Sequence, residues 1–126
     1  MEIQDFTGRR FLVVDDESLV RETLVEQFSL RGATVMEASD GNDAFHLILE
    51  QDFDAVLCDI RMPECSGIDL LRLMKSSKES MPPMIMMSAF DDVSTEELQK
   101  LGARSFFLKA GGFQKIENAI AKLISE

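Results

Sequence analysis

The chain has 126 residues, 45% of them hydrophobic, which is the size of one domain with a full hydrophobic core. Its 23 acidic and 13 basic residues give a net charge of −10, which disfavours direct binding to nucleic acid or to an anionic membrane. No apolar run approaches the ~20 residues that span a bilayer, and no signal-like segment opens the chain. We therefore expect one cytoplasmic domain over residues 1–126, with its two cysteines, Cys58 and Cys65, as reduced thiols.

Short apolar segments alternate with segments of helical period, and this βαβα order predicts a parallel sheet with helices on both faces. The predicted strands are 10–14, 33–38, 53–59, 84–88 and 105–108. Helices are predicted at 18–31, after a turn at 39–42, at 68–77, from a cap at Ser94 to Gly102, and at 113–125. In the first helix, the stripe expected to face the sheet is Leu19, Val20, Thr23, Leu24, Gln27 and Phe28. The predicted fold class is a doubly wound α/β protein.

Polar side chains stand at the ends of four of the five predicted strands. Asp15 and Asp16 follow the first strand, Asp59 ends the third, Ser88 ends the fourth and Lys109 follows the fifth. The carboxyl ends of parallel strands meet at one edge of the sheet, so these side chains should lie together. Neighbouring carboxylates repel one another unless a cation neutralises them, and hard oxygen ligands suit Mg²⁺. The pattern therefore predicts a magnesium site at this edge.

Such a site can carry phosphoryl chemistry. With Mg²⁺ bound, Asp59 could attack a phosphoryl group, Ser88 could donate a hydrogen bond to a phosphoryl oxygen, and Lys109 could supply a positive charge. The product would be an acyl phosphate, which adds a charge of roughly −2 at the edge of the sheet.

At these residues the chain resembles the receiver domain of two-component response regulators, of the chemotaxis-regulator type, over about residues 10–124. The matching features are the acidic corner at 14–17, Asp59 followed by Met62-Pro63 and Gly67, the small pair Ser88-Ala89, Gly102-Ala103, and an aromatic residue three positions before Lys109. Each motif is weak alone, but their order and spacing together are specific. The resemblance implies a flavodoxin-like sheet of five strands in the order 2-1-3-4-5 with five helices.

The resemblance also implies a phosphoacceptor role for Asp59, which would take its phosphoryl group from a phosphohistidine. The donor would be a sensor histidine kinase or a histidine phosphotransfer protein. Asp16, Asp59 and the main-chain carbonyl of Arg61 would bind Mg²⁺, and Asp15 would help through water. On this interpretation the chain is a signalling switch and not an enzyme.

Ser88 and Phe106 would form the switch pair of such a receiver. Ser88 would move toward the phosphoryl group, and the Phe106 ring would turn inward into the vacated space. The face made by the fourth helix, fifth strand and fifth helix would then be remodelled for an unknown output protein or domain. The domain would be a monomer or a phosphorylation-dependent dimer.

Three positions depart from the usual receiver pattern. Ala110 follows Lys109 where receivers usually have proline, and a cis bond before alanine costs ~2.5–4 kcal/mol, so we expect a trans bond. Phe106 lacks the hydroxyl of the commoner tyrosine. Arg61 and Phe90 are bulky residues beside the site, and they suggest slow loss of phosphate from Asp59.

Two other functions are open. A receiver-like docking module that is phosphorylated poorly would be consistent with Ala110. A Mg²⁺-dependent aspartyl-phosphate hydrolase of the haloacid dehalogenase kind would need a second acid two residues after Asp59, but that residue is Arg61.

Overall fold

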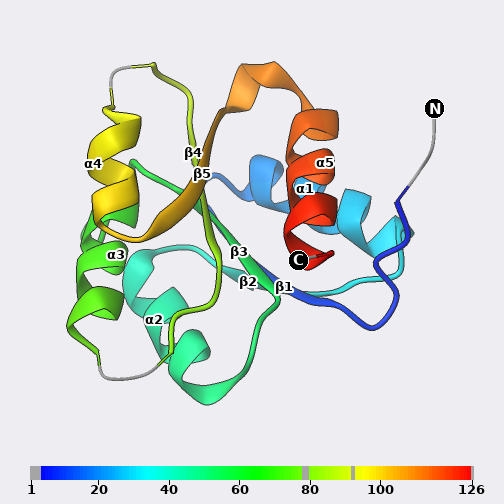
Figure 1. Ribbon diagram of the computed structural model, residues 1–126, viewed down its shortest axis with the longest axis horizontal. Helices are drawn as coiled ribbons and strands as arrows, with labels where there is room; N and C mark the ends of the chain where they lie inside the picture. The colour runs from blue at the N-terminus through cyan, green and yellow to red at the C-terminus, as the bar shows by residue number, and fades with distance from the viewer. Residues whose placement is uncertain (1–3, 78–79, 92, 126) are drawn as a thin grey trace.

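The computed structural model describes residues 4–77, 80–91 and 93–125, which form one parallel sheet flanked by helices (Figure 1). The sheet has five strands in the order β2-β1-β3-β4-β5, which confirms the expected topology. The strands are β1 Arg10–Val14, β2 Thr34–Ala38, β3 Ala55–Asp59, β4 Met84–Ser88 and β5 Ala103–Leu108.

Five helices connect and follow the strands: α1 Ser18–Leu30, α2 Gly41–Glu50, α3 Gly67–Ser76, α4 Thr95–Lys100 and α5 Phe113–Ile124. Helices α1 and α5 cover one face of the sheet, and α2, α3 and α4 cover the other (Figure 1). The predicted cap at Ser94 is confirmed, since its hydroxyl accepts a hydrogen bond from the Glu97 N–H at 3.2 Å. A short 3-10 turn, Lys109–Gly111, joins β5 to α5.

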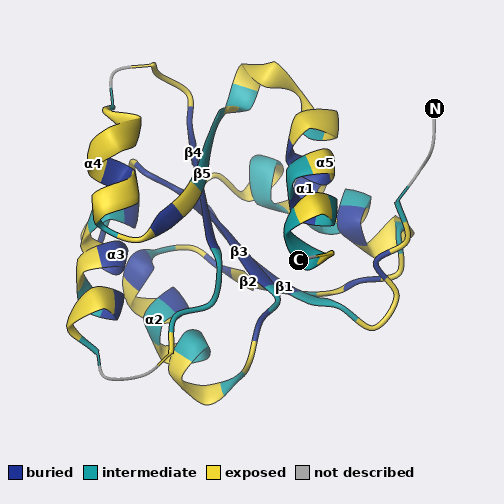
Figure 2. Ribbon diagram, viewed as in Figure 1, coloured by how far each residue is buried: buried dark blue, intermediate teal, exposed yellow. Residues whose placement is uncertain are grey.

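The hydrophobic core lies on both faces of the sheet, because successive side chains of a strand point to opposite faces. Strands β3 and β4 are buried at every position, as Figure 2 shows in dark blue. On β4, Met84 and Met86 pack under α2, α3 and α4, whereas Ile85 and Met87 pack under α1 and α5. Three methionines therefore fill the centre of the domain.

Helix α1 buries a narrower stripe than the sequence predicts. Leu24 and Phe28 are buried and Val20 packs against them, but Leu19 is 74% exposed and Thr23 is also exposed. The prediction was wrong for these two residues. The exposure of Leu19 follows from helix geometry, because at 3.6 residues per turn it lies roughly 140° around the helix from the buried Leu24.

A buried ion pair ties α1 to α5. Arg31, which follows α1, pairs with Glu117 of α5, and the exposed fractions of the two side chains are 12% and 3%. The Arg31 guanidinium also lies 4.8 Å from the centre of the Phe113 ring, and it donates a hydrogen bond to the carbonyl of Gln27 at 2.8 Å. The Gln4 N–H donates to Glu117 Oε2 at 3.3 Å. The network fixes both helices and the chain before β1.

Both cysteines are buried and unbonded to one another, as expected of reduced thiols. None of the helices in the part of the chain that the structure describes is long and apolar enough to cross a membrane.

Candidate functional site

The site lies at the carboxyl edge of the sheet, where the ends of β1, β3, β4 and β5 meet. Asp15 directly follows β1, Asp59 and Ser88 are the last residues of β3 and β4, and Lys109 directly follows β5. Asp15, Asp59 and Ser88 are buried, with exposed fractions of 0%, 4% and 0%. The structure thus brings together four of the residues that the sequence assigned to the site.

Lys109 joins the acidic residues of this edge. Its Nζ lies 2.8 Å from Asp15 Oδ2, 3.3 Å from Asp59 Oδ2 and 3.5 Å from Glu17 Oε1. The bond between Lys109 and Ala110 is trans, as predicted, and the lysine still reaches the carboxylates. One ammonium group faces three carboxylates, so the site carries a net negative charge.

The charged groups of the site shift the pKa values of Asp59 and Lys109. Burial, and after it the negative charge of Asp15, raise the pKa of Asp59, while Lys109 and a hydrogen bond from the Arg61 backbone oppose that rise. Burial alone would lower the pKa of Lys109, but its contacts with Asp15 and Asp59 raise it. Lys109 is therefore held in its charged form against Asp15 and Asp59.

After β3 the chain turns back and packs closely against the backbone of Asp59. A Cβ at Gly67, the first residue of α3, would collide with the carbonyl oxygen of Asp59 and would lie 2.8 Å from Met86 Cε. Within the loop, Glu64 has φ of 65°, and the Cys65 N–H donates to the Pro63 carbonyl at 2.7 Å. This is a γ-turn with positive φ, which is strained for a residue with a side chain. The turn brings α3 back to the end of β3.

The donor set fits a divalent cation. Oxygen atoms of Asp15, Glu17 and Asp59 all lie within 4.8 Å of one another. Asp15 Oδ2 is fully buried and, besides its ion pair with Lys109, accepts no hydrogen bond from the described residues. One ammonium group is shared by these carboxylates, which leaves negative charge for a cation to neutralise, and carboxylates are ligands that Mg²⁺ prefers.

One predicted metal ligand, Asp16, lies apart from the central carboxylates. Asp16 is exposed and lies outside the group that the structure brings within 4.8 Å. Glu17, which belongs to the acidic corner but had no predicted role, lies inside that group. The main-chain carbonyl of Arg61 stays a prediction.

Two side chains from the loops after β3 and β4 contact each other. Arg61, two residues after Asp59, places its guanidinium 5.3 Å from the centre of the Phe90 ring. Phe90, two residues after Ser88, is 59% exposed. A cation over an aromatic face is an attractive contact, so this pair links the loop after β3 to the loop after β4.

The predicted switch residues are Ser88, at the end of β4, and Phe106, within β5. Ser88 Oγ accepts a hydrogen bond from the Phe90 N–H at 3.1 Å, so its own hydroxyl hydrogen is available to another acceptor. Phe106 is partly buried against the core under α2, α3 and α4, and it pairs in register with Met86 on β4. The two residues sit on adjacent strands.

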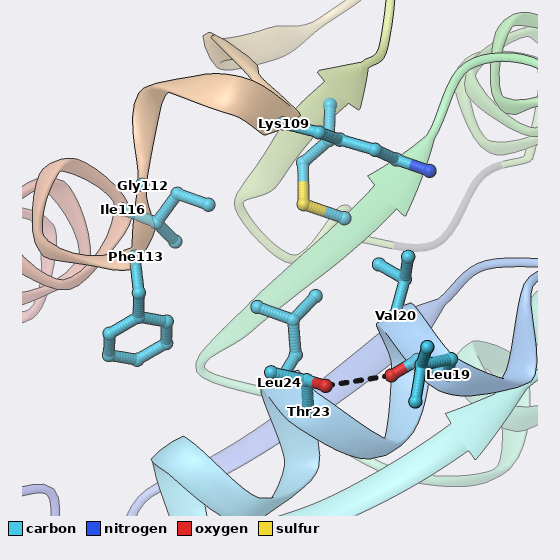
Figure 3. A pocket seen from close by; sticks show the side chains of 9 residues that line it. Leu19, Val20, Thr23, Leu24, Lys109, Gly112, Phe113 and Ile116 are labelled. Carbon is cyan, nitrogen blue, oxygen red and sulfur yellow. Dashed lines mark hydrogen bonds between the residues drawn. The ribbon is translucent and has the colours of Figure 1, made fainter.

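A separate apolar cavity of about 330 Å³ lies between α1 and α5 (Figure 3). The stem of Lys109 forms part of its wall, but the amine points away from Phe113 and Leu24 in this view. The cavity therefore contains none of the acidic groups. Its lining consists of Leu19, Val20, Thr23, Leu24, Met87, Lys109, Gly112, Phe113 and Ile116.

Comparison with known proteins identifies the class of this fold and site. Residues 11–121 match the response regulator receiver domain family, and the chain belongs to that family. Receiver domains are the signalling modules of two-component response regulators, so the resemblance seen in the sequence is confirmed.

The curated relatives that match this chain are longer regulatory proteins. It is 42% identical over 101 residues to the regulatory protein AtoC of Escherichia coli strain K12, covering 79% of this chain and 22% of AtoC. It is 36% identical over 117 residues to the transcriptional regulatory protein ZraR of Salmonella typhimurium, covering 90% of this chain and 26% of ZraR. The chain thus spans about a quarter of the length of these two relatives.

Solved structures agree with the fold. The receiver domain of the Francisella response regulator 1452 is 27% identical with a TM-score of 0.84, over 94% of this chain and 98% of that one. The response regulator TrrA of Thermotoga maritima, solved in complex with Mg²⁺-BeF, is 28% identical with a TM-score of 0.81, over 91% and 98% of the two chains.

Proposed function

We propose that Asp59 accepts a phosphoryl group from a phosphohistidine on a partner sensor histidine kinase or histidine phosphotransfer protein. The observation that carries this proposal is the contact of Lys109 with both Asp15 and Asp59 at the carboxyl edge of the sheet. Asp59 is delivered there by a strand that is buried at every position, so its backbone is rigid. The acceptor and its counter-charge are therefore in place before a donor arrives.

The transfer itself needs little from the protein besides position and charge. One Asp59 carboxylate oxygen attacks phosphorus, the bond between phosphorus and the imidazole nitrogen breaks, and its electron pair stays on the imidazole. Mg²⁺, held by Asp15 and Asp59 with the predicted Asp16 and the Arg61 carbonyl, would supply positive charge to the phosphoryl oxygens. Lys109 adds a further positive charge from the carboxyl end of β5, at the same edge of the sheet.

The signal would then pass to the face formed by α4, β5 and α5. The Ser88 hydroxyl can donate to a phosphoryl oxygen, because among the described residues it accepts from the Phe90 N–H and donates to none. Movement of Ser88 would open space for the ring of Phe106 on the neighbouring strand. Phe106 has no hydroxyl, so turning inward buries no polar group. An output protein or domain would bind the changed face, with or without dimerisation.

Phosphorylation with a small donor tests the proposal. The protein and an Asp59→Asn variant would be incubated with acetyl phosphate and Mg²⁺, and their intact masses compared. We expect the wild type to gain one phosphoryl group, and we expect that gain to disappear in the variant and in the presence of a chelator. A wild type that stays unmodified would refute the acceptor role.

That negative result would favour the docking module considered from the sequence. Its main support was the residue Ala110 after Lys109, but Lys109 Nζ lies 3.3 Å from Asp59 Oδ2. An Ala110→Pro variant that gained labelling in that case would locate the impairment at this junction.

The proposal is restricted to the residues of this chain. Its net charge of −10 supports the absence of direct nucleic-acid contact here. ZraR is named as a transcriptional regulator, but the chain covers 26% of it, so the activities of the rest of such proteins are not assigned to this domain.

A further inference from the structure

An arginine of α1 holds the main chain of Asp15. Arg21 Nη1 donates a hydrogen bond to the Asp15 carbonyl at 2.7 Å, and Arg21 Nε lies 3.1 Å from Glu37 Oε1 of β2. Strand β1 ends at Val14, so this carbonyl lies just beyond the paired part of the strand. The Arg21 side chain is 18% exposed. Its guanidinium therefore connects α1, the end of β1 and β2 at one point.

The carboxylate of the same aspartate belongs to the phosphoacceptor site. Asp15 Oδ2 lies 2.8 Å from Lys109 Nζ, which in turn lies 3.3 Å from Asp59 Oδ2. The Asp15 N–H donates to the carbonyl of Ala38 at 3.1 Å, and the whole residue is buried. An aspartate side chain is short, so the position of its carboxylate follows the position of its main chain. Whatever fixes that main chain also fixes the carboxylate against Lys109.

We propose that Arg21 is a positioning residue for phosphoryl transfer to Asp59, which acts by fixing the main chain of Asp15. The inference rests on the proposed function and adds a residue to it. Arg21 contacts the carbonyl of Asp15, whereas Lys109 contacts the carboxylate, so the effect of Arg21 on the transfer is indirect. Arginine suits this role because its planar guanidinium donates in a fixed geometry from more than one nitrogen, here to a carbonyl and to a carboxylate.

Loss of Arg21 should slow the transfer more than it destabilises the domain. Glu37 is 43% exposed, so removal of the arginine leaves a solvated carboxylate and no buried charge without a partner. Removal of a group that orients the residues of such a site typically lowers activity about 10–100-fold. We therefore expect Arg21→Gln to fold and to label Asp59 roughly tenfold more slowly than the wild type.

The rate of labelling by acetyl phosphate, followed by intact mass, tests the assignment. The proteins are the wild type, Arg21→Gln, Arg21→Lys and Arg9→Gln. Arg9 is the matched control, because its replacement removes the same charge and breaks a surface pair with Asp54 at 3.6 Å. Arg9→Gln should label within about twofold of the wild type. Lysine can still donate to the Asp15 carbonyl but lacks the planar fork, so Arg21→Lys should recover part of the rate.

A nuclear magnetic resonance measurement separates positioning from a general loss of structure, and it needs no phosphodonor. The ¹⁵Nζ resonance of Lys109 reports on its ion pair with Asp15. We expect this resonance to shift in Arg21→Gln and to keep its wild-type position in Arg9→Gln. Urea unfolding gives the folded fraction of each variant, so labelling rates are compared per folded molecule.

Two results would overturn the inference. One is an Arg21→Gln variant that labels as fast per folded molecule as Arg9→Gln. The other is an Arg21→Gln variant that labels slowly while its Lys109 resonance stays unchanged, because the arginine would then have only a structural role. If Arg21→Gln does not fold, Arg21→Lys keeps the charge and takes its place in both comparisons. A wild type that does not label would refute the acceptor role of Asp59, and the Lys109 resonance would still decide whether Arg21 fixes Asp15.

Discussion

Substitution of Glu117 by glutamine should destabilise the domain strongly. The change removes the counter-charge of Arg31, whose side chain is 12% exposed, and leaves that guanidinium mostly buried and unpaired by charge. Removing one partner of a buried pair costs about 3–5 kcal/mol. Arg31 keeps its hydrogen bond to the Gln27 carbonyl and its contact with the Phe113 ring. We therefore expect a loss of about 2–4 kcal/mol, or roughly 8–16 °C in Tm.

The assay is urea unfolding followed by far-ultraviolet circular dichroism, because the chain has 0 Trp and 0 Tyr for fluorescence. Glu96→Gln is the matched control, since Glu96 pairs with Lys100 at 3.9 Å on the surface and should lose at most about 0.5 kcal/mol. Replacing both buried partners, in Arg31→Met with Glu117→Leu, should recover most of the lost stability. The reasoning fails if Glu117→Gln loses no more free energy of unfolding than Glu96→Gln.

Three further predictions concern the site. In chelator, Asp59→Asn should raise the free energy of unfolding at pH 7 by about 0.5–2 kcal/mol. Burial and the charge of Asp15 raise the pKa of Asp59, so the free energy of unfolding of the wild type should fall as the pH rises from 3.8 through the raised pKa. An Asp59→Asn variant that is more stable by the same amount at low and at neutral pH would contradict this. Phe90→Ala removes the ring under Arg61 and should shorten the lifetime of phospho-Asp59 several-fold, measured as the decay of the phosphorylated mass. A wild-type lifetime of seconds that Phe90→Ala does not change would contradict slow hydrolysis. Glu64→Gly relieves a backbone φ of 65° that costs about 1–2 kcal/mol, but glycine also raises the entropy of the unfolded chain. Urea unfolding should therefore show a free energy of unfolding higher by up to about 1 kcal/mol, and a clear decrease would refute the prediction.

The position of the site followed from the sequence because it depends on topology. Parallel strands place their carboxyl ends on one edge, so Asp15, Asp59, Ser88 and Lys109 had to converge once their strands were recognised. The apolar runs that define those strands are strong local signals, and the boundaries of β1 and β4 were predicted to the residue.

What the sequence did not predict depends on side-chain direction and on distant partners. The turn after β1 directs Glu17 and not Asp16 toward Lys109, and residue order alone does not contain that choice. Arg31 and Glu117 are 86 positions apart, and each looks like an ordinary solvated charge on its helix. Only the packing of α1 against α5 makes them a pair.

The methionines of β4 make the centre of this domain chemically vulnerable. Met86 reaches from its strand toward Gly67, beneath Asp59, and pairs in register with Phe106. Its unbranched thioether can refill space around a turning ring at little cost, which a β-branched residue could not do. Oxidation of the same sulfur to a sulfoxide would place a polar oxygen in a dry core. Burial protects Met86 in the folded domain. If an oxidant reached Met86 during unfolding, the sulfoxide would disturb the packing between β4 and Phe106 of β5 without altering any residue of the acidic pocket.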